Sequence, residues 1–414
     1  MTKIILKNCK KIYTVENSAK DLIGEKYNLS ILIEDEKIKK ISEFKELESE
    51  INKDTKIIDC EEKCVLPGFV DPHTHLAFGG DRKAEYLTKL YTKDAEVLKE
   101  KVGVVGMKSS VDQTRKISLE DLIKDSKDKL DMLLKSGITT VEVKSGYGID
   151  KDTEIKQLKA IREVSKIVPQ TIISTYLGGH DWDYEMGKEK YLDFMIEEVM
   201  PVIYEKNLAD MADIWVEEQF FSVDQGRKYL KAAKKYGMNG TIHGNELSSV
   251  GASKMAAEEK VYSVAHLNYL TDEEIEIMIK NDVVGILLPT TDYVKQYSKV
   301  FANGRKFVDK GMTVAMATNL NPGNYTVSML LNMDMACRNN GLSAEESLRA
   351  ATLNGAKALR VDSKYGSIEI GKYADIQIWN TDDFRNSIYM HGANFIDTVI
   401  KHGKIVVQNR NLVY

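Results

Sequence analysis

Eight short apolar segments, each followed by a helical pattern, recur along the chain between residues 65 and 360. Most of them are apolar on both faces, which is typical of parallel strands whose two sides are covered. The predicted strands are 65–71, 139–144, 171–176, 212–217, 239–242, 261–265, 283–288 and 313–317. Eight strand–helix units over roughly 290 residues match a (β/α)8 TIM barrel with insertions, so we predict an α/β fold of this type.

The clearest of the intervening helices is predicted over residues 119–135. Ser118 can cap its first turn, apolar residues then follow at helical spacing, and Gly137 ends it. An open, doubly wound sheet is the alternative arrangement for such units. That alternative is disfavoured because no G-x-G-x-x-G phosphate-binding turn follows the first strand.

The two ends of the chain have a different pattern, with short β-type runs and no long helix. The predicted elements are strands at 3–6, 29–33, 37–41, 375–379, 398–400 and 404–407 and a hairpin-like segment at 366–371. We expect both ends to form one small β-sandwich domain. The predicted domains are therefore 1–64 plus 361–414 for the β-sandwich and 65–360 for the barrel.

Composition excludes several classes of partner. The net charge is −5 over 414 residues, whereas a nucleic-acid-binding protein needs a basic face. No segment approaches the ~20 uninterrupted apolar residues of a membrane span, and the alternation of apolar residues with lysine after Met1 does not fit a signal peptide. Cys60 and Cys64 have no second pair to complete a zinc knuckle, so we expect the four cysteines to be reduced, in a cytoplasmic protein.

Five of the seven histidines fall at the carboxyl ends of predicted barrel strands. They are His73, His75, His180, His243 and His266. Active sites of TIM barrels lie at that end, and positions i and i+2 share one face of a strand, so His73 and His75 can point toward one place. Imidazole is a common metal ligand, and we therefore predict a divalent metal site. Asn319 and Asn321, after the eighth strand, add two amides to the same rim.

Several motifs resemble those of a known family. The segments Pro-Gly-Phe-Val-Asp-Pro-His-Thr-His at 67–75 and Gly-Lys-Tyr-Ala-Asp-Ile at 371–376 resemble the metal-dependent amidohydrolase superfamily. Within it, the chain is similar to the imidazolonepropionases of histidine degradation along nearly its whole length. The matching stretches are 73–82, 144–148, 176–180, 243–246 and 320–323. The Phe-Gly-Gly-x-Arg and Ser-Gly-Tyr-Gly segments are specific to this family rather than to the superfamily.

The resemblance implies a hydrolase that opens the ring of 4-imidazolone-5-propanoate to N-formimidoyl-L-glutamate with metal-activated water. It also implies one divalent ion, Zn or Fe, and a homodimer. The implied metal ligands are His73, His75, His243 and the residue at position 319. The implied substrate-binding residues are Arg82, Tyr147, His180, Glu246, Asn321, Gly323 and Asn324, and the implied catalytic residues are Glu246 and His266. An arginine fork at Arg82 suits the propionate carboxylate better than a lysine would.

The chain departs from the family pattern in three places. Asn319 stands where the family has an aspartate that ligates the metal and takes the proton of water. Because an amide is neutral and no base, this change is expected to slow hydrolysis by a factor on the order of 10² to 10⁴ unless another group substitutes. Val-Val-Gly-Met at 104–107 replaces a glycine-rich loop near the substrate, and Asp181 and Asp183 add carboxylates that could substitute for the aspartate.

Simpler interpretations and other functions remain open from the sequence. Arg82 could be an exposed loop charge, Tyr147 a rim aromatic and Glu246 a helix cap. The chain could also be a paralogue acting on another carboxylate-bearing five-membered ring, such as a hydantoin or thiohydantoin propionate. A catalytically impaired binding protein is the third possibility, although the presence of His180, Glu246 and His266 favours an enzyme.

Overall fold

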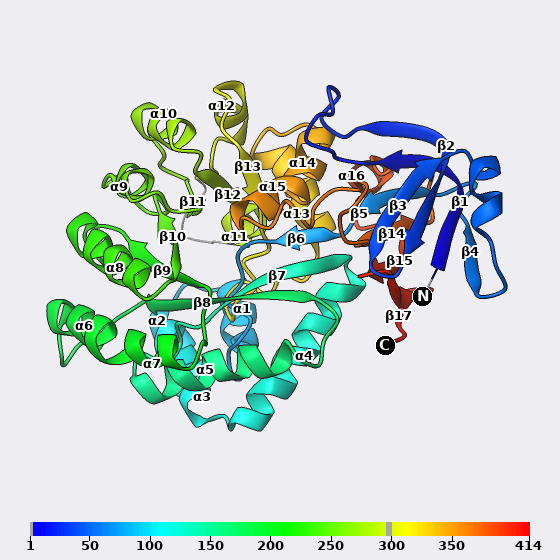
Figure 1. Ribbon diagram of the computed structural model, residues 1–414. Coiled ribbons are helices and arrows are strands. Elements are labelled where there is room, and N and C mark those ends of the chain that lie inside the picture. The colour runs from blue at the N-terminus through cyan, green and yellow to red at the C-terminus, as the bar shows by residue number, and fades with distance from the viewer. Residues whose placement is uncertain (1–2, 295–299) are drawn as a thin grey trace.

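The computed structural model describes residues 3–294 and 300–414. Figure 1 shows a barrel of strands surrounded by helices, with a separate sheet beside it in which the blue N-terminal strands lie next to the red C-terminal ones. The predicted fold class, a (β/α)8 TIM barrel with a small β-sandwich formed by both termini, is confirmed in the barrel and in the pairing of the two termini. The terminal strands form one mixed sheet.

Eight parallel strands form the barrel, and they are neighbours in chain order. They are β6 Phe69–Asp71, β7 Ile138–Lys144, β8 Thr171–Gly179, β9 Met211–Val216, β10 Asn239–Gly244, β11 Ser263–His266, β12 Val284–Leu287 and β13 Val314–Met316. Beyond the strand ends, the Asn319 N–H donates to the His73 carbonyl at 3.1 Å and the His75 N–H to the Leu320 carbonyl at 2.9 Å. These bonds join the last strand to the first, so the barrel nearly closes at its carboxyl end.

The helices cover the outside of the barrel and connect its strands (Figure 1). The predicted helix over 119–135 is α4, where the Ser118 hydroxyl accepts from the Asp121 N–H and Gly137 follows with a positive φ. The helices are α1 Lys83–Lys89, α2 Ala95–Val102, α3 Gly106–Lys116, α4 Leu119–Lys135, α5 Lys151–Val164, α6 Lys188–Phe194, α7 Met200–Glu205, α8 Val223–Lys235, α9 Ala252–Glu258, α10 Asp272–Lys280, α11 Pro289–Val294, α12 Gly304–Asp309, α13 Met329–Asn339, α14 Ala344–Ala350, α15 Leu353–Ala358 and α16 Asn386–Tyr389.

The second sheet has nine strands and mixes parallel and antiparallel pairs. They are β1 Lys3–Tyr13, β2 Glu25–Glu34, β3 Lys37–Ser42, β4 Thr55–Asp59, β5 Cys64–Pro67, β14 Ile376–Trp379, β15 Ile396–Lys401, β16 Lys404–Gln408 and β17 Asn411–Leu412. Isoleucines from β1, β2, β14 and β15 enclose a core of its own. The segment 366–371, expected to be hairpin-like, instead forms turns, and two of its N–H groups donate to Thr14 and Ile38.

The single strand expected over 65–71 is wrong, because the run divides at Gly68 between the two sheets. β5 pairs with β1 and β14, whereas β6 pairs with β7. A Cβ at Gly68 would lie 2.2 Å from the Thr139 hydroxyl oxygen, so only glycine fits at this crossing. β5 belongs to the terminal sheet and ends at Pro67, three residues beyond the domain boundary expected at residue 64. The division into two domains stays a proposal.

Two composition-based expectations can also be compared with the structure. Among the described residues, no helix is both long and apolar enough to cross a bilayer. All four cysteines are free thiols, and three of them are buried.

Candidate metal centre and substrate cavity

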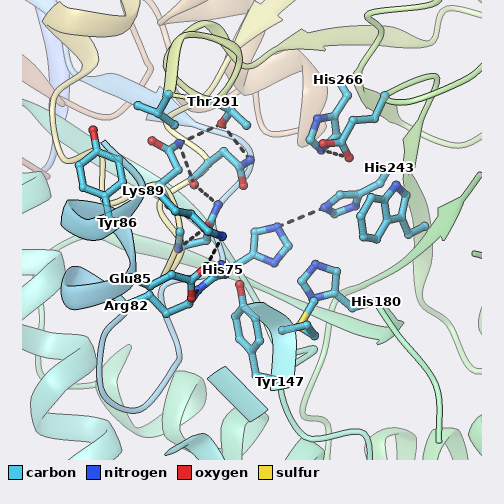
Figure 2. A pocket seen from close by; sticks show the side chains of 18 residues that line it. His75, Arg82, Glu85, Tyr86, Lys89, Tyr147, His180, His243, His266 and Thr291 are labelled. Carbon is cyan, nitrogen blue, oxygen red and sulfur yellow. Dashed lines mark hydrogen bonds and ion pairs between the residues drawn. The ribbon is translucent and has the colours of Figure 1, made fainter. Parts of the chain in front are cut away.

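Five buried histidines meet at the carboxyl end of the barrel. His73 and His75 follow β6, His180 follows β8, His243 lies on β10 and His266 ends β11. The ring centroids of His73 and His243 are 4.5 Å apart, those of His75 and His180 are 4.8 Å apart, and those of His243 and His266 are 5.2 Å apart. Figure 2 shows four of these rings converging around one cavity. The structure therefore brings together all five histidines that the sequence analysis selected.

The ring nitrogens form two groups of three that could each hold a metal ion. One is His73, His243 and His266, and the other is His75, His180 and His243, with the ligand atoms of each group within 4.8 Å of one another. His243 belongs to both, and its Nε2 lies 3.1 Å from Nε2 of His75. The sequence analysis expects His73, His75 and His243 on one ion. That ligand set stays a prediction.

The charge state and hydrogen bonding of these side chains fit a metal centre. Burial lowers the pKa of His73 and His75 well below the usual range, and neighbouring cationic groups act in the same direction. The rings are therefore neutral and can donate lone pairs. Both nitrogens of His73, Nδ1 of His75 and Oδ1 of Asn319 have no hydrogen-bond partner within the described chain. Such buried atoms are costly to leave unsatisfied, and a divalent cation would satisfy them.

A buried ion-pair network lies beneath His243. Its Nδ1 is 3.0 Å from Asp213 Oδ2, and Asp213 Oδ1 accepts the His243 backbone N–H. Lys144 lies 2.8 Å from Asp213 and 2.6 Å from Glu142. Although burial opposes ionisation, His243 and Lys144 hold the pKa of Asp213 well below its usual range. The Asp213 carboxylate thus anchors one nitrogen of His243, while the other faces His75.

Glu246 and His266 form a second polar pair at the cavity. Glu246 Oε2 lies 3.4 Å from Nε2 of His266, and both side chains are more than nine-tenths buried. The Glu246 backbone N–H donates to Glu217 Oε1 at 2.5 Å, which fixes the loop after β10. His266 has a φ of +83°, in the left-handed region that residues with a Cβ rarely occupy. A carboxylate and an imidazole at this distance can exchange a proton.

The histidines line a cavity of about 270 Å³. It contains every expected site residue except His73, together with others that the sequence analysis did not select. The lining is His75, Arg82, Glu85, Tyr86, Lys89, Met107, Tyr147, His180, Trp215, His243, Glu246, His266, Thr291, Val294, Asn319, Asn321, Gly323 and Asn324. This volume suits a small ligand, and the lining combines aromatic side chains with a few polar groups.

Arg82 is anchored at this cavity by a carboxylate on the next turn. Arg82 Nε and Nη2 donate to the two oxygens of Glu85 at 2.8 Å and 2.6 Å. Lys89 donates to the same carboxylate at 2.5 Å, and the Gly106 N–H adds a fourth bond at 2.9 Å. Because Glu85 is only 2% exposed, Arg82 is held in one place rather than free in a loop.

Acidification should remove a stabilising contribution of Glu85. Burial alone would raise its pKa, but Arg82, Lys89 and the Gly106 N–H lower it to about 2, against an ordinary 4.5. A depressed folded-state pKa stabilises the protein above about pH 5, and this stabilisation is lost as the pH falls toward 2. We expect Glu85→Gln to be less stable than the unaltered protein by on the order of 2 kcal/mol at pH 7.

The measurement is a series of denaturant unfolding curves from pH 7 down to the lowest pH at which the protein still folds. The gap between Glu85→Gln and the unaltered protein should narrow steadily below pH 5. Glu100→Gln, an exposed position on α2, serves as the control and should run parallel to the unaltered protein. Parallel curves for Glu85→Gln as well would show that the ion pairs of Glu85 add no net stability.

The loop after β13 is held by its own amides. Asn321 accepts the N–H groups of Gly323 and Asn324 and donates to the Asn319 carbonyl. The Asn324 amide donates to Thr291 Oγ1 at 2.9 Å and accepts from Thr326. Asn319 Nδ2 also donates to Thr291 Oγ1, at 3.0 Å. Asn321 and Asn324 thus line the cavity, and their amides are used in hydrogen bonds that hold the loop. Oδ1 of Asn319 takes part in none of these bonds and can bind a ligand or an ion.

The carboxylates after His180 do not take the place of the missing aspartate. Asp181 accepts from Trp182 and Tyr184, Asp183 accepts backbone N–H groups of its own loop, and neither lines the cavity. The substituted loop at 104–107 does reach it, through Met107.

The simpler interpretations of two residues also disagree with the structure. Tyr147 is only 4% exposed, so it is no rim aromatic. The residue that precedes α9 as its cap is Gly251 rather than Glu246. Both Tyr147 and Glu246 are instead buried at the cavity.

Sequence reasoning missed several groups at the site. Glu85 lies three residues after Arg82, and Lys89 lies four residues after Glu85. These spacings place side chains on one face of a helix, so the sequence did carry a signal for this group. Asp213 is a charged residue inside the otherwise apolar β9, and Glu142 and Lys144 lie on the predicted strand 139–144. Charges in buried strands are unusual enough to indicate a buried network. Thr291 carries no such signal, because nothing local marks it as the partner of Asn319.

Comparisons with known proteins agree with this geometry. A profile described as the Amidohydrolase family matches residues 64–406. An imidazolonepropionase of Alkaliphilus oremlandii is 39% identical over 88% of this chain and 86% of its own, and one of Alkaliphilus metalliredigens is 34% identical over the full length of both. An atrazine chlorohydrolase of Arthrobacter aurescens TC1, solved in complex with zinc, has the same fold, with a TM-score of 0.72, 17% identity and coverage of 99% of this chain and 96% of its own.

The family match covers most of the chain, and the similarity to the curated relatives extends through both the barrel and the terminal sheet. Together with the histidine cluster at the barrel mouth, these matches show that the chain is a hydrolase of the amidohydrolase family and belongs to its imidazolonepropionase branch.

Proposed function

We propose that this chain hydrolyses 4-imidazolone-5-propanoate to N-formimidoyl-L-glutamate, a step of histidine degradation. The observation that carries the proposal is a single cavity with one part suited to bind a metal ion and another suited to bind a carboxylate. Its histidine cluster suits a metal, and Arg82 beside it suits a carboxylate. The imidazolonepropionases that resemble the chain along its whole length support the same reaction.

In this proposal one divalent ion, Zn or Fe, is held by His73, His75, His243 and Asn319. Such an ion would supply Lewis-acid polarisation of the ring carbonyl and would acidify water. Asp213 keeps the His243 ring turned toward the site, since it anchors Nδ1. The ring of His180 is buried and stacks on that of His75, and in this proposal it would contact the ring of the substrate.

Glu246 and His266 are assigned to proton transfer. Water adds to the ring carbonyl carbon, and the bond from that carbon to the ring nitrogen breaks. That carbon becomes a carboxylate of the product, and the ring nitrogen that it releases takes up a proton. A pair only 3.4 Å apart can take the proton from the attacking water and return one to the departing nitrogen. Arg82 and Tyr147 hold the side chain of the substrate meanwhile.

A second candidate is hydrolysis of a related ring that carries a carboxylate, such as hydantoin-5-propanoate. Two observations favour it. Met107 lines the cavity where the family has a glycine-rich loop, and Asn319 replaces the usual aspartate. Arg82, held in place by Glu85, could bind the carboxylate of either substrate.

The test is metal content together with hydrolysis of both rings by the purified protein. We expect close to one equivalent of Zn or Fe per chain and loss of the imidazolone absorbance, with N-formimidoyl-L-glutamate as the product. Turnover of hydantoin-5-propanoate alone would select the second candidate. Bound metal without turnover of either ring would overturn both and favour a binding protein.

We propose a homodimer, which the family resemblance supports, and a cytoplasmic location, which four free thiols support. Size-exclusion chromatography with light scattering measures the oligomeric state directly.

A further inference from the structure

The wall of the cavity around Glu85 carries two cations, although the sequence analysis selected only one. Arg82 and Lys89 both contact the Glu85 carboxylate, at 2.6 Å and 2.5 Å. Figure 2 shows the three side chains together, on the opposite side of His75 from His243 and His266. Arg82 and Lys89 contribute two positive charges and Glu85 one negative charge, so this wall has a net charge of +1.

The contacts of Arg82 limit what it can do alone. Nε and Nη2, the edge that usually forms a fork with a carboxylate, already bond to Glu85. Nη1 lies beside Gly323, 3.2 Å from the position of a Cβ there. Arg82 therefore offers a substrate carboxylate only part of its donor set.

Lys89 can supply the missing donors. Its ammonium group has three hydrogens, one of which goes to Glu85. The side chain lines the same cavity and keeps 40% of its surface exposed, so it is within reach of a ligand. Glu85 lies between the two cations and keeps them from separating.

We propose that Lys89 is a second binding group for the side-chain carboxylate of the substrate, with Glu85 as the positioning residue that holds Arg82 and Lys89 side by side. This inference rests on the proposed function, because it assumes a ring substrate that carries a carboxylate. It makes Lys89 a determinant of specificity for anionic over neutral side chains.

The experiment measures binding of a non-hydrolysable probe, 3-(imidazol-4-yl)propanoate, and of its neutral carboxamide by calorimetry. Loss of a charge-assisted hydrogen bond in Lys89→Met is expected to raise the Kd of the carboxylate about tenfold or more and to leave that of the carboxamide unchanged. Lys89→Arg should restore most of the affinity. Lys99→Met, an exposed lysine on α2 outside the cavity, is the control.

Steady-state kinetics distinguish a binding role of Lys89 from a merely structural one, because a structural ion pair would not change KM alone. Lys89→Met should raise KM for the ring substrate about tenfold while kcat stays within about threefold. Equal effects on the carboxylate and carboxamide probes, or none on either, would overturn the role of Lys89. If the unaltered protein binds the carboxylate through Lys89 but hydrolyses neither ring, the proposed function fails and the carboxylate site stands.

Discussion

Replacing His243 with alanine is expected to empty the metal site and abolish hydrolysis. His243 belongs to both groups of three ring nitrogens, so its loss leaves neither complete. Metal content should fall from about one equivalent per chain to near zero, and kcat/KM should fall by a factor on the order of 10³ or more, because water activation depends on the ion. Elemental analysis of the dialysed protein and steady-state kinetics measure the two effects.

The matched control is His391→Ala, which removes an imidazole that is 60% exposed and lies outside the site. It should keep both metal and activity. Far-UV circular dichroism separates loss of metal from loss of fold, because a His243→Ala protein that keeps its helical signal has lost the metal without unfolding. Full metal content in His243→Ala would contradict the assignment of this histidine as a ligand.

Much of the fold could be predicted because the barrel strands are short, apolar on both faces and end in polar residues. The predicted segment 313–317, for example, contains β13, and Asn319 follows it at the barrel mouth. Pro67-Gly68 marks a break in the apolar run, but nothing local shows that its two halves belong to different sheets. What separates β5 from β6 is the approach of Thr139, a residue 71 positions later in the chain.

The histidines of the site could also be predicted, since each is tied to the end of a strand. Its supporting charges carry a sequence signal, but which of them meet could not be predicted. Lys144 lies on β7 and Asp213 on β9, with β8 between them, so they meet only because both side chains are buried inside the barrel. Lys89 lies on α1, which lines the cavity, and although Glu85 and Lys89 share one helix face, nothing local in the sequence shows that this face lies at the cavity.

Replacing Asn319 with aspartate is expected to tighten metal binding and to raise hydrolysis about tenfold or more. Oδ1 of Asn319 is buried, without a partner in the described part of the chain, and lies at the histidine cavity. An aspartate would present a charged oxygen at the same place. The backbone tolerates it, because the φ of +48° at this position is one that asparagine and aspartate both adopt. Thr291, which now accepts from Nδ2, can rotate its hydroxyl to donate instead.

Chelator competition gives the metal affinity of Asn319→Asp, and kinetics on the ring substrate give its turnover. Asn321→Asp adds the same charge at the cavity but on a side chain that is bonded to its own loop, so it should improve neither property. Tighter metal binding with slower hydrolysis in Asn319→Asp would mean that the neutral amide is the adapted ligand. The proton of the attacking water would then go to Glu246 and His266, and Glu246→Gln would lower turnover in both backgrounds alike.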